Sequence, residues 1–141
     1  MILDRENAFS QSQALTGTTL VPSTDVIDLS QIRQVGIGDD LYLVLNFEVA
    51  PGGTSPTITV ALQTDDNVGF ASPATPITYM SAVTTPGASS QLVFPLPYQG
   101  LERFIRLAYT QGGTTPTTTL SAHITHTAQY DIKLPSGFTV A

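Results

Sequence analysis

The 141-residue sequence contains no cysteine and no tryptophan, and only 11% of its residues are charged. Without cysteine, the chain can form no disulfide bond and offers no thiol chemistry. Five basic residues stand against eleven acidic ones, which gives a formal net charge of −6. This balance argues against nucleic acid as a partner, because affinity for nucleic acid comes largely from neutralising phosphates with basic side chains.

Long apolar runs are also absent. No stretch approaches the roughly 20 apolar residues that a membrane-spanning helix needs. At the N-terminus, Asp4 and Glu6 interrupt the chain soon after the apolar pair Ile2 and Leu3, whereas a secretory signal needs an apolar stretch of roughly 7–15 residues. We therefore expect neither a signal peptide nor a membrane as partner.

The residues that are abundant predict an all-β domain. Threonine, serine, glycine, proline and glutamine are frequent, and 41% of the residues are hydrophobic. Threonine favours strands, while glycine and proline favour the turns between them. A chain of this length is most simply one domain, large enough to bury a substantial core.

Alternating apolar residues predict a series of short strands. The expected strands are residues 25–29, 41–50, 57–65, 77–83, 91–97, 103–110 and 117–130. In the second of these, the odd positions from Leu41 to Val49 share the face expected to meet the core. The segments PGGTSP (51–56) and QGGTTP (111–116) predict hairpin loops, and Pro95 indicates an edge position or a bulge. We expect an antiparallel two-sheet sandwich of jelly-roll type.

Asp65, Asp66 and Asn67 form the densest group of oxygen ligands in the sequence. A loop of this kind could hold Ca²⁺, but the following residues lack the spaced acids of a calcium loop. The simpler interpretation is an Asx-rich turn after a strand, and Asp39 with Asp40 is a similar turn before one. We expect no metal and no other cofactor.

The two histidines, His123 and His126, lie three residues apart on a predicted strand. Alternation sends them to opposite faces, so they cannot chelate one ion without a bulge. His126 has the parity of the apolar residues before it, which predicts a place at the margin of the core. Ser-His-Asp catalysis needs an oriented base, and no nucleophile-elbow motif is present. We expect no catalytic residue; a calcium-dependent or hydrolytic enzyme centred on Asp65, Asp66 and His126 is the least favoured alternative.

Three of the four arginines, Arg33, Arg103 and Arg106, lie close to predicted strand edges. Glu102 precedes Arg103, and a structural ion pair between Glu102 and a nearby arginine would contribute little if exposed. The alternative is contact with another molecule, since arginine is enriched at interfaces. The sequence leaves both interpretations open.

A sugar-binding sandwich, such as an adhesion module, is the main alternative to a structural role. Sugar sites usually stack a ring on an exposed aromatic side chain. In the absence of tryptophan the candidates are the tyrosines, most of which occupy strand positions that packing explains. They are Tyr42, Tyr79, Tyr98, Tyr109 and Tyr130.

An ordered set of segments resembles the capsid cement (decoration) proteins of tailed bacteriophages. The segments are MILDRENAFSQSQALTGTT, STDVIDL, IGDDLYLVLNF, VALQTDDN and LERFIRLAYT. This resemblance implies a jelly-roll-like sandwich without catalytic residues, located on the outer surface of the virion capsid and made in the bacterial cytoplasm. It also implies two kinds of partner: the major capsid protein and copies of the protein itself, as a dimer or a trimer.

With this resemblance, the chain divides into an N-terminal arm (1–24), a sandwich domain (25–133) and a C-terminal tail (134–141) whose role is open. The polar arm is expected to order against a neighbouring subunit or the shell, at an entropic cost. The alternative is that it covers the edge of its own sheet. The expected contact residues are Ile2, Leu3, Arg5 and Phe9 of the arm, together with Arg33, Arg103 and Arg106.

Overall fold

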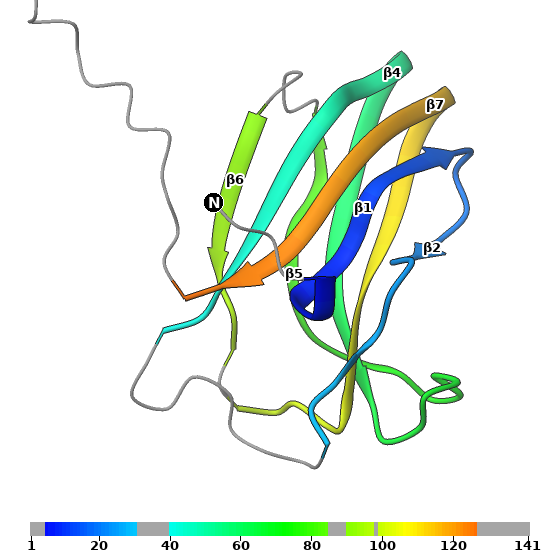
Figure 1. Cartoon of the computed structure of the whole chain (residues 1–141). Helices are drawn as coiled ribbons and strands as arrows, with labels where there is room; N and C mark the ends of the chain where they lie inside the picture. The colour runs from blue at the N-terminus through cyan, green and yellow to red at the C-terminus, as the bar shows by residue number, and fades with distance from the viewer. Residues whose placement is uncertain (1–4, 31–39, 85–89, 98, 127–141) are drawn as a thin grey trace, which may run out of the picture.

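The computed structural model describes residues 5–30, 40–84, 90–97 and 99–126 (Figure 1). A short 3-10 helix, η1 (Arg5–Asn7), precedes seven strands. The strands are β1 (Ala8–Thr16), β2 (Val21–Pro22), β3 (Ile27–Asp28), β4 (Tyr42–Asp65), β5 (Ala74–Thr84), β6 (Ser90–Pro95) and β7 (Phe104–Thr125). All the strand pairs are antiparallel and belong to one sheet, which confirms the all-β prediction. Within these residues, no helix has the length and apolar character needed to cross a membrane.

The sheet is organised around β4 and β7, which pair along their whole length from Tyr42 with Thr125 to Asp65 with Phe104. Each long strand therefore includes a segment that the sequence predicts as a hairpin loop. The prediction of two hairpins is wrong, because residues 42–50 and 57–65 are successive parts of one strand and do not pair with each other. The two glycine-rich segments instead lie opposite each other, with Thr54 paired to Thr114.

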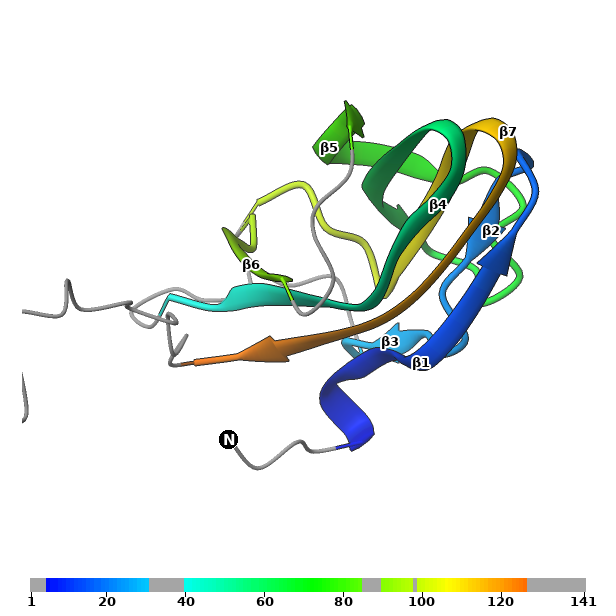
Figure 2. The same ribbon diagram turned by 90° about the horizontal axis from the view of Figure 1, so that it is seen from above.

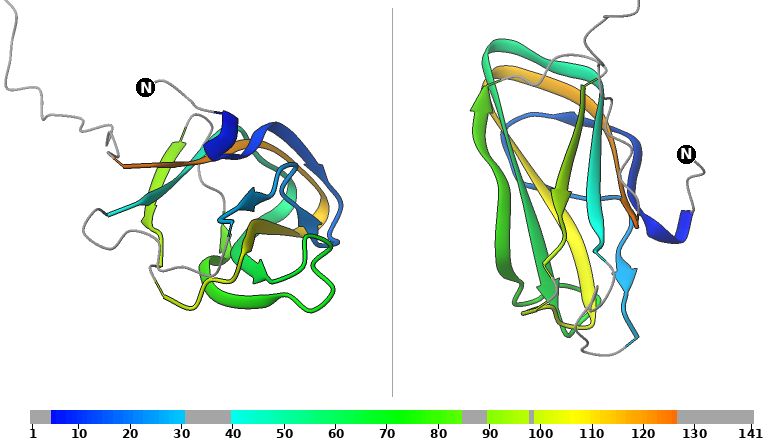
Figure 3. Two further views of the ribbon diagram at one scale, coloured as in Figure 1. Left: turned by 60° about the horizontal axis from the view of Figure 1, so that its bottom comes forward. Right: turned by 90° about the vertical axis from the view of Figure 1, so that its left-hand side faces the viewer.

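The glycine-rich segments bend both long strands at the same level. Seen from above and from the side, β4 and β7 curve over together and turn back (Figures 2 and 3). Gly53 and Gly113 have φ angles of 101° and 103°, a left-handed conformation that favours glycine. A Cβ atom on Gly113 would lie 2.7 Å from the carbonyl oxygen of Thr54, and one on Gly53 would collide with the carbonyl oxygen of Thr114. Glycine is therefore required on both strands of the bend.

The bend gives each half of the two long strands its own neighbours. Residues 42–47 of β4 pair with β6, and residues 57–64 pair with β5. On β7, residues 117–123 pair with β1, while the short strands β2 and β3 pair with residues 104–109. For Pro95 the sequence left an edge position and a bulge open, and the structure shows the edge position, because β6 pairs only with β4 within the described residues.

One hydrophobic core fills the space between the two halves of the bent sheet. Its fully buried members come from β1, both halves of β4 and both halves of β7. They include Phe9, Leu15, Leu43, Leu45, Phe47, Ile58, Leu62, Ile105, Leu107, Tyr109 and Leu120. Val49 departs from the predicted pattern and is 54% exposed, because the register shifts between Phe47 and Val49. The bulge there moves Val49 off the core face.

The N-terminal segment is part of this sheet. Residues 8–16 form β1, which lies beside β7 and pairs with its residues 117–123 (Figure 1). Phe9 has no exposed surface and packs in the core, so the prediction that it anchors the chain on another molecule is wrong. β1 instead lies along its own sheet and pairs with β7, as in the alternative that the sequence left open. Ile2 and Leu3 lie outside the described residues.

Candidate functional sites

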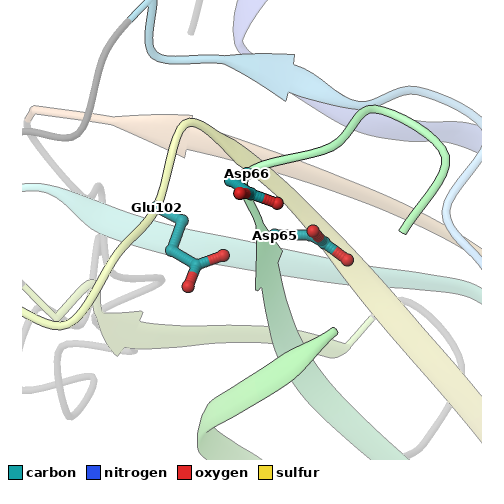
Figure 4. Close-up of side chains that lie close together, drawn as sticks. All are labelled: Asp65, Asp66 and Glu102. Carbon is teal, nitrogen blue, oxygen red and sulfur yellow. The ribbon is translucent and has the colours of Figure 1, made fainter. Parts of the chain in front are cut away.

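The acidic group predicted from the sequence gathers at the end of β4. Asp65 and Asp66 lie there, and Glu102 joins them from the segment that leads into β7 (Figure 4). One carboxylate oxygen from each residue lies within 4.8 Å of the others. The side chain of Thr64 holds the two segments together, because its hydroxyl accepts the N–H of Glu102 at 2.7 Å and donates to the carbonyl of Phe104 at 3.0 Å.

Asp65 is buried and organises the loop that follows it. Its Oδ1 accepts the N–H of Asn67 at 3.0 Å, and its Oδ2 accepts the N–H of Ser72 at 2.9 Å. These backbone hydrogen bonds, with Asn67 first, lower the pKa of Asp65. A calcium site needs six to eight oxygen ligands, whereas both oxygens of Asp65 already anchor the loop. The geometry favours the Asx-turn interpretation of this sequence.

Arg106 of β7 contacts this loop and the end of β4. Its Nε donates to Oε1 of Gln63 at 2.9 Å, and its guanidinium carbon lies 4.1 Å from the ring centroid of Phe70. Phe70 is buried, and its backbone has a φ of 50°, which is uncommon for a residue other than glycine. Arg106 is thus half-buried and engaged within its own domain.

Arg103 forms an ion pair with Asp28 of β3. Its Nε and Nη2 each donate to one carboxylate oxygen of Asp28 at 2.9 Å. The sequence suggests Glu102 as a nearby partner, but the carboxylate that the fold supplies comes from a strand 75 residues away. The pair ties β3 to the start of β7. Arg33 lies outside the described residues, and for Arg5 the structure describes the backbone of η1.

The positions of the two histidines differ from those predicted from the sequence. β7 ends at Thr125, so His126 lies beyond the strand and is exposed rather than at the core margin. His123 is the buried one, and this burial lowers the pKa of its imidazole. The structure does not bring His126 together with Asp65 and Asp66 into a site.

The described tyrosines are engaged in packing. Tyr109 is in the core, where its hydroxyl lies 2.8 Å from that of Ser10. Tyr79 packs against Phe94, with 5.2 Å between the centroids of the tilted rings, and burial raises the pKa of Tyr79. Tyr42 is half-buried beside an apolar pocket of about 340 Å³ that also contacts β5 and the end of β6. Tyr98 and Tyr130 lie outside the described residues, so the described part of the chain presents no exposed tyrosine for a sugar ring.

A second pocket, of about 320 Å³, lies where β1, β4 and β7 run side by side. Sequence reasoning missed it, although Glu48 is the only charged residue between Asp40 and Asp65. Its remaining lining residues are small or polar: Ala8, Ser10, Gln11, Ser12, Ser121 and His123. We call it the Glu48 pocket.

The fold defines an all-β domain built on one bent antiparallel sheet, with polar groups that organise loops and a small pocket on β1, β4 and β7. Comparison with known families then identifies the group to which it belongs. The family model described as Bbp16 matches residues 9–124, from β1 almost to the end of β7. The chain belongs to the Bbp16 family. No curated protein matches it.

Proposed function

We propose that this protein is a capsid cement protein, which binds the outer surface of an icosahedral phage head and holds neighbouring capsomers together. The main support is the family match, which covers residues 9–124 and carries a name that suggests a phage-related protein. The ordered segments of the sequence that resemble decoration proteins point the same way. The proposed place of action is therefore the virion.

The bent sheet supports the finer description of the fold as a two-layer, jelly-roll-like sandwich. Residues 42–47 of β4, with β6, β1 and the last part of β7, would form one layer. Residues 57–64, with β5, β2, β3 and the first part of β7, would form the other. The single core between them is what a two-layer architecture requires.

Three of the strands at the edges of the sheet give this domain surfaces suited to association. Within the described residues, β1 pairs only with β7, while β5 and β6 pair only with β4. An edge strand presents backbone N–H and C=O groups that can pair with a strand of another chain. Copies of the protein and the major capsid protein are the proposed partners, and closed symmetric assemblies are the usual outcome for identical subunits.

The proposed mechanism is thermodynamic rather than catalytic. A protein that binds the assembled shell and not its separated capsomers stabilises the shell by mass action. Many copies across symmetric seams add avidity. Pressure from packaged DNA then has to break these contacts as well as the shell's own.

Co-sedimentation with empty, expanded heads of the same phage tests this proposal. We expect saturable binding in a fixed ratio to the major capsid protein, and resistance of the decorated heads to heat or osmotic shock. Unexpanded heads and a β-protein of similar size and charge serve as controls. Failure to bind the expanded heads, or binding without saturation, would refute the cement function.

A further inference from the structure

The Glu48 pocket combines one exposed carboxylate with an otherwise uncharged lining. Glu48 lies on β4, and β1 and β7 provide the other walls. His123 lines the pocket as well, and burial lowers the pKa of its imidazole, which disfavours the charged form. Glu48 is the one carboxylate among the residues that line the pocket.

The carboxylate of Glu48 is held in place by two serine hydroxyls. Ser121 donates to Oε1 at 2.5 Å, and Ser12 lies 2.9 Å from both Oε1 and Oε2. Two hydroxyl hydrogens thus serve a carboxylate that can accept about four hydrogen bonds. Accepting capacity remains, mainly at Oε2, for donors that enter from the pocket.

The backbone of β1 has an irregular conformation at the serine that contacts Glu48. Ser12 has a φ of 46°, and the register between β1 and β7 shifts between Ser10 and Gln13. At this bulge the N–H of Ser12 donates to the Ser121 hydroxyl at 2.8 Å. One strained residue therefore orients both hydroxyls that fix Glu48. A strained backbone conformation of this kind costs free energy of folding and persists only where the surrounding contacts hold it in place.

Neither of the two arginines whose side chains the structure describes neutralises Glu48. Arg103 is paired with Asp28, and Arg106 is engaged with Gln63 and Phe70. Serine hydroxyls position the carboxylate without cancelling its charge. An oriented anion in a small pocket is complementary to an ammonium or guanidinium group.

We propose that the Glu48 pocket receives a lysine or arginine side chain of the shell protein when the domain docks on the capsid. The inference rests on the cement function and names one contact of that docking surface. A shell residue is favoured over a second copy, because this chain carries only five basic residues and the two whose side chains are described are engaged. A net charge of −6 also favours a basic docking surface.

The test compares the binding of Glu48→Gln and wild-type protein to expanded heads in the co-sedimentation assay. The variant is isosteric, removes one negative charge, and is exposed enough to leave the fold intact. We expect its affinity to fall by about tenfold, which corresponds to about 1.4 kcal/mol, with a weaker dependence on salt. Glu102→Gln is the matched control, since it makes the same charge change outside the pocket, and its affinity should stay close to wild type.

Each outcome supports or contradicts a separate statement. If Glu48→Gln binds as wild type does, the pocket contact is refuted and the cement function stands. If Glu102→Gln loses as much affinity as Glu48→Gln, the effect is general electrostatics and the pocket contact is again refuted. If wild type does not bind heads, both proposals fail.

A second variant guards against an effect of Glu48 on folding. Ser121→Ala keeps the charge and removes one hydroxyl that orients it, so we expect a smaller loss of affinity in the same assay. Thermal unfolding of both variants checks that the fold is retained. Wild-type affinity in Ser121→Ala would refute the role of a preoriented carboxylate.

Discussion

The bend of the β4–β7 ribbon and the end of the ribbon at Asp65 are held by different kinds of interaction. At the bend, the backbones of residues 51–56 and 111–116 approach so closely that glycine is required on both strands. At the Asp65 end, side chains make the main contacts: Asp65 anchors a loop through backbone N–H groups, and the Arg106 guanidinium lies over Phe70. At Gly53 and Gly113 an added Cβ atom would collide with backbone carbonyl groups, whereas the loop end depends on individual polar contacts. We therefore expect substitutions at the bend to be costlier.

Gly113→Ala should give the largest loss of stability. The alanine would have to adopt a φ of 103° and would place its Cβ 2.7 Å from the Thr54 carbonyl oxygen. We expect the free energy of unfolding to fall by roughly 3 kcal/mol or more, from strain and overpacking together. Chemical denaturation monitored by circular dichroism measures this.

Gly17→Ala is the matched control for the bend. Gly17 also has a positive φ, 79°, but a Cβ there would meet nothing within 4 Å. It should therefore show the strain cost alone, about 1 kcal/mol. Equal losses in the two variants would mean that the close approach of the two backbones does not matter.

Phe70→Leu should have an intermediate effect. Leucine keeps most of the apolar volume but removes the ring face that lies 4.1 Å from the Arg106 guanidinium carbon. Because this pair is partly desolvated, we expect a loss of about 1–2 kcal/mol in the free energy of unfolding. Phe104→Leu removes a comparable but half-exposed contact, 4.8 Å from Arg103, and should cost less. A larger loss of stability in Phe104→Leu than in Phe70→Leu would contradict the importance of the buried contact between Arg106 and Phe70.

Asp65→Asn should have a pH-dependent and smaller effect. The folded state lowers the pKa of Asp65, so the folded protein binds fewer protons at this group than the unfolded chain. Its stabilisation is complete above the ordinary aspartate pKa of about 3.9 and is lost as the pH falls through the lower, folded value. The stability difference between wild type and Asp65→Asn should thus narrow from about pH 7 to about pH 3.

Thermal melts across this pH range measure the effect. Asp40→Asn serves as the control, because Asp40 is exposed and lies outside the acidic group. A difference between wild type and Asp65→Asn that stays constant with pH would show that the carboxylate charge is not what anchors the loop.

The sequence predicts the all-β class and most of the core, because alternation is a local property of each strand. Residues such as Leu43, Leu45 and Leu62 lie on the predicted face and are fully buried. The bend could not be distinguished from a hairpin loop, since the paired glycines of PGGTSP and QGGTTP favour both. What decides between them is the pairing of β4 with β7, a contact between residues far apart in the sequence.

β1 and the Glu48 pocket were missed for a related reason. Two register shifts in β1 disrupt the alternation that marks a strand, so its polar residues resemble an arm. The pocket joins Glu48, Ser12 and Ser121 from three strands that only the folded sheet brings together. The Asp65 turn is different, because its contacts reach at most seven residues along the chain and its sequence signal is local.

The continuity of β4 and β7 through the bend has a mechanical consequence. In a domain whose halves are joined only by side-chain contacts, a force that separates them is opposed by the core alone. Here the same two polypeptide segments run through both halves, so tension applied to one half passes to the other along covalent bonds. The halves cannot part without unravelling the two longest strands.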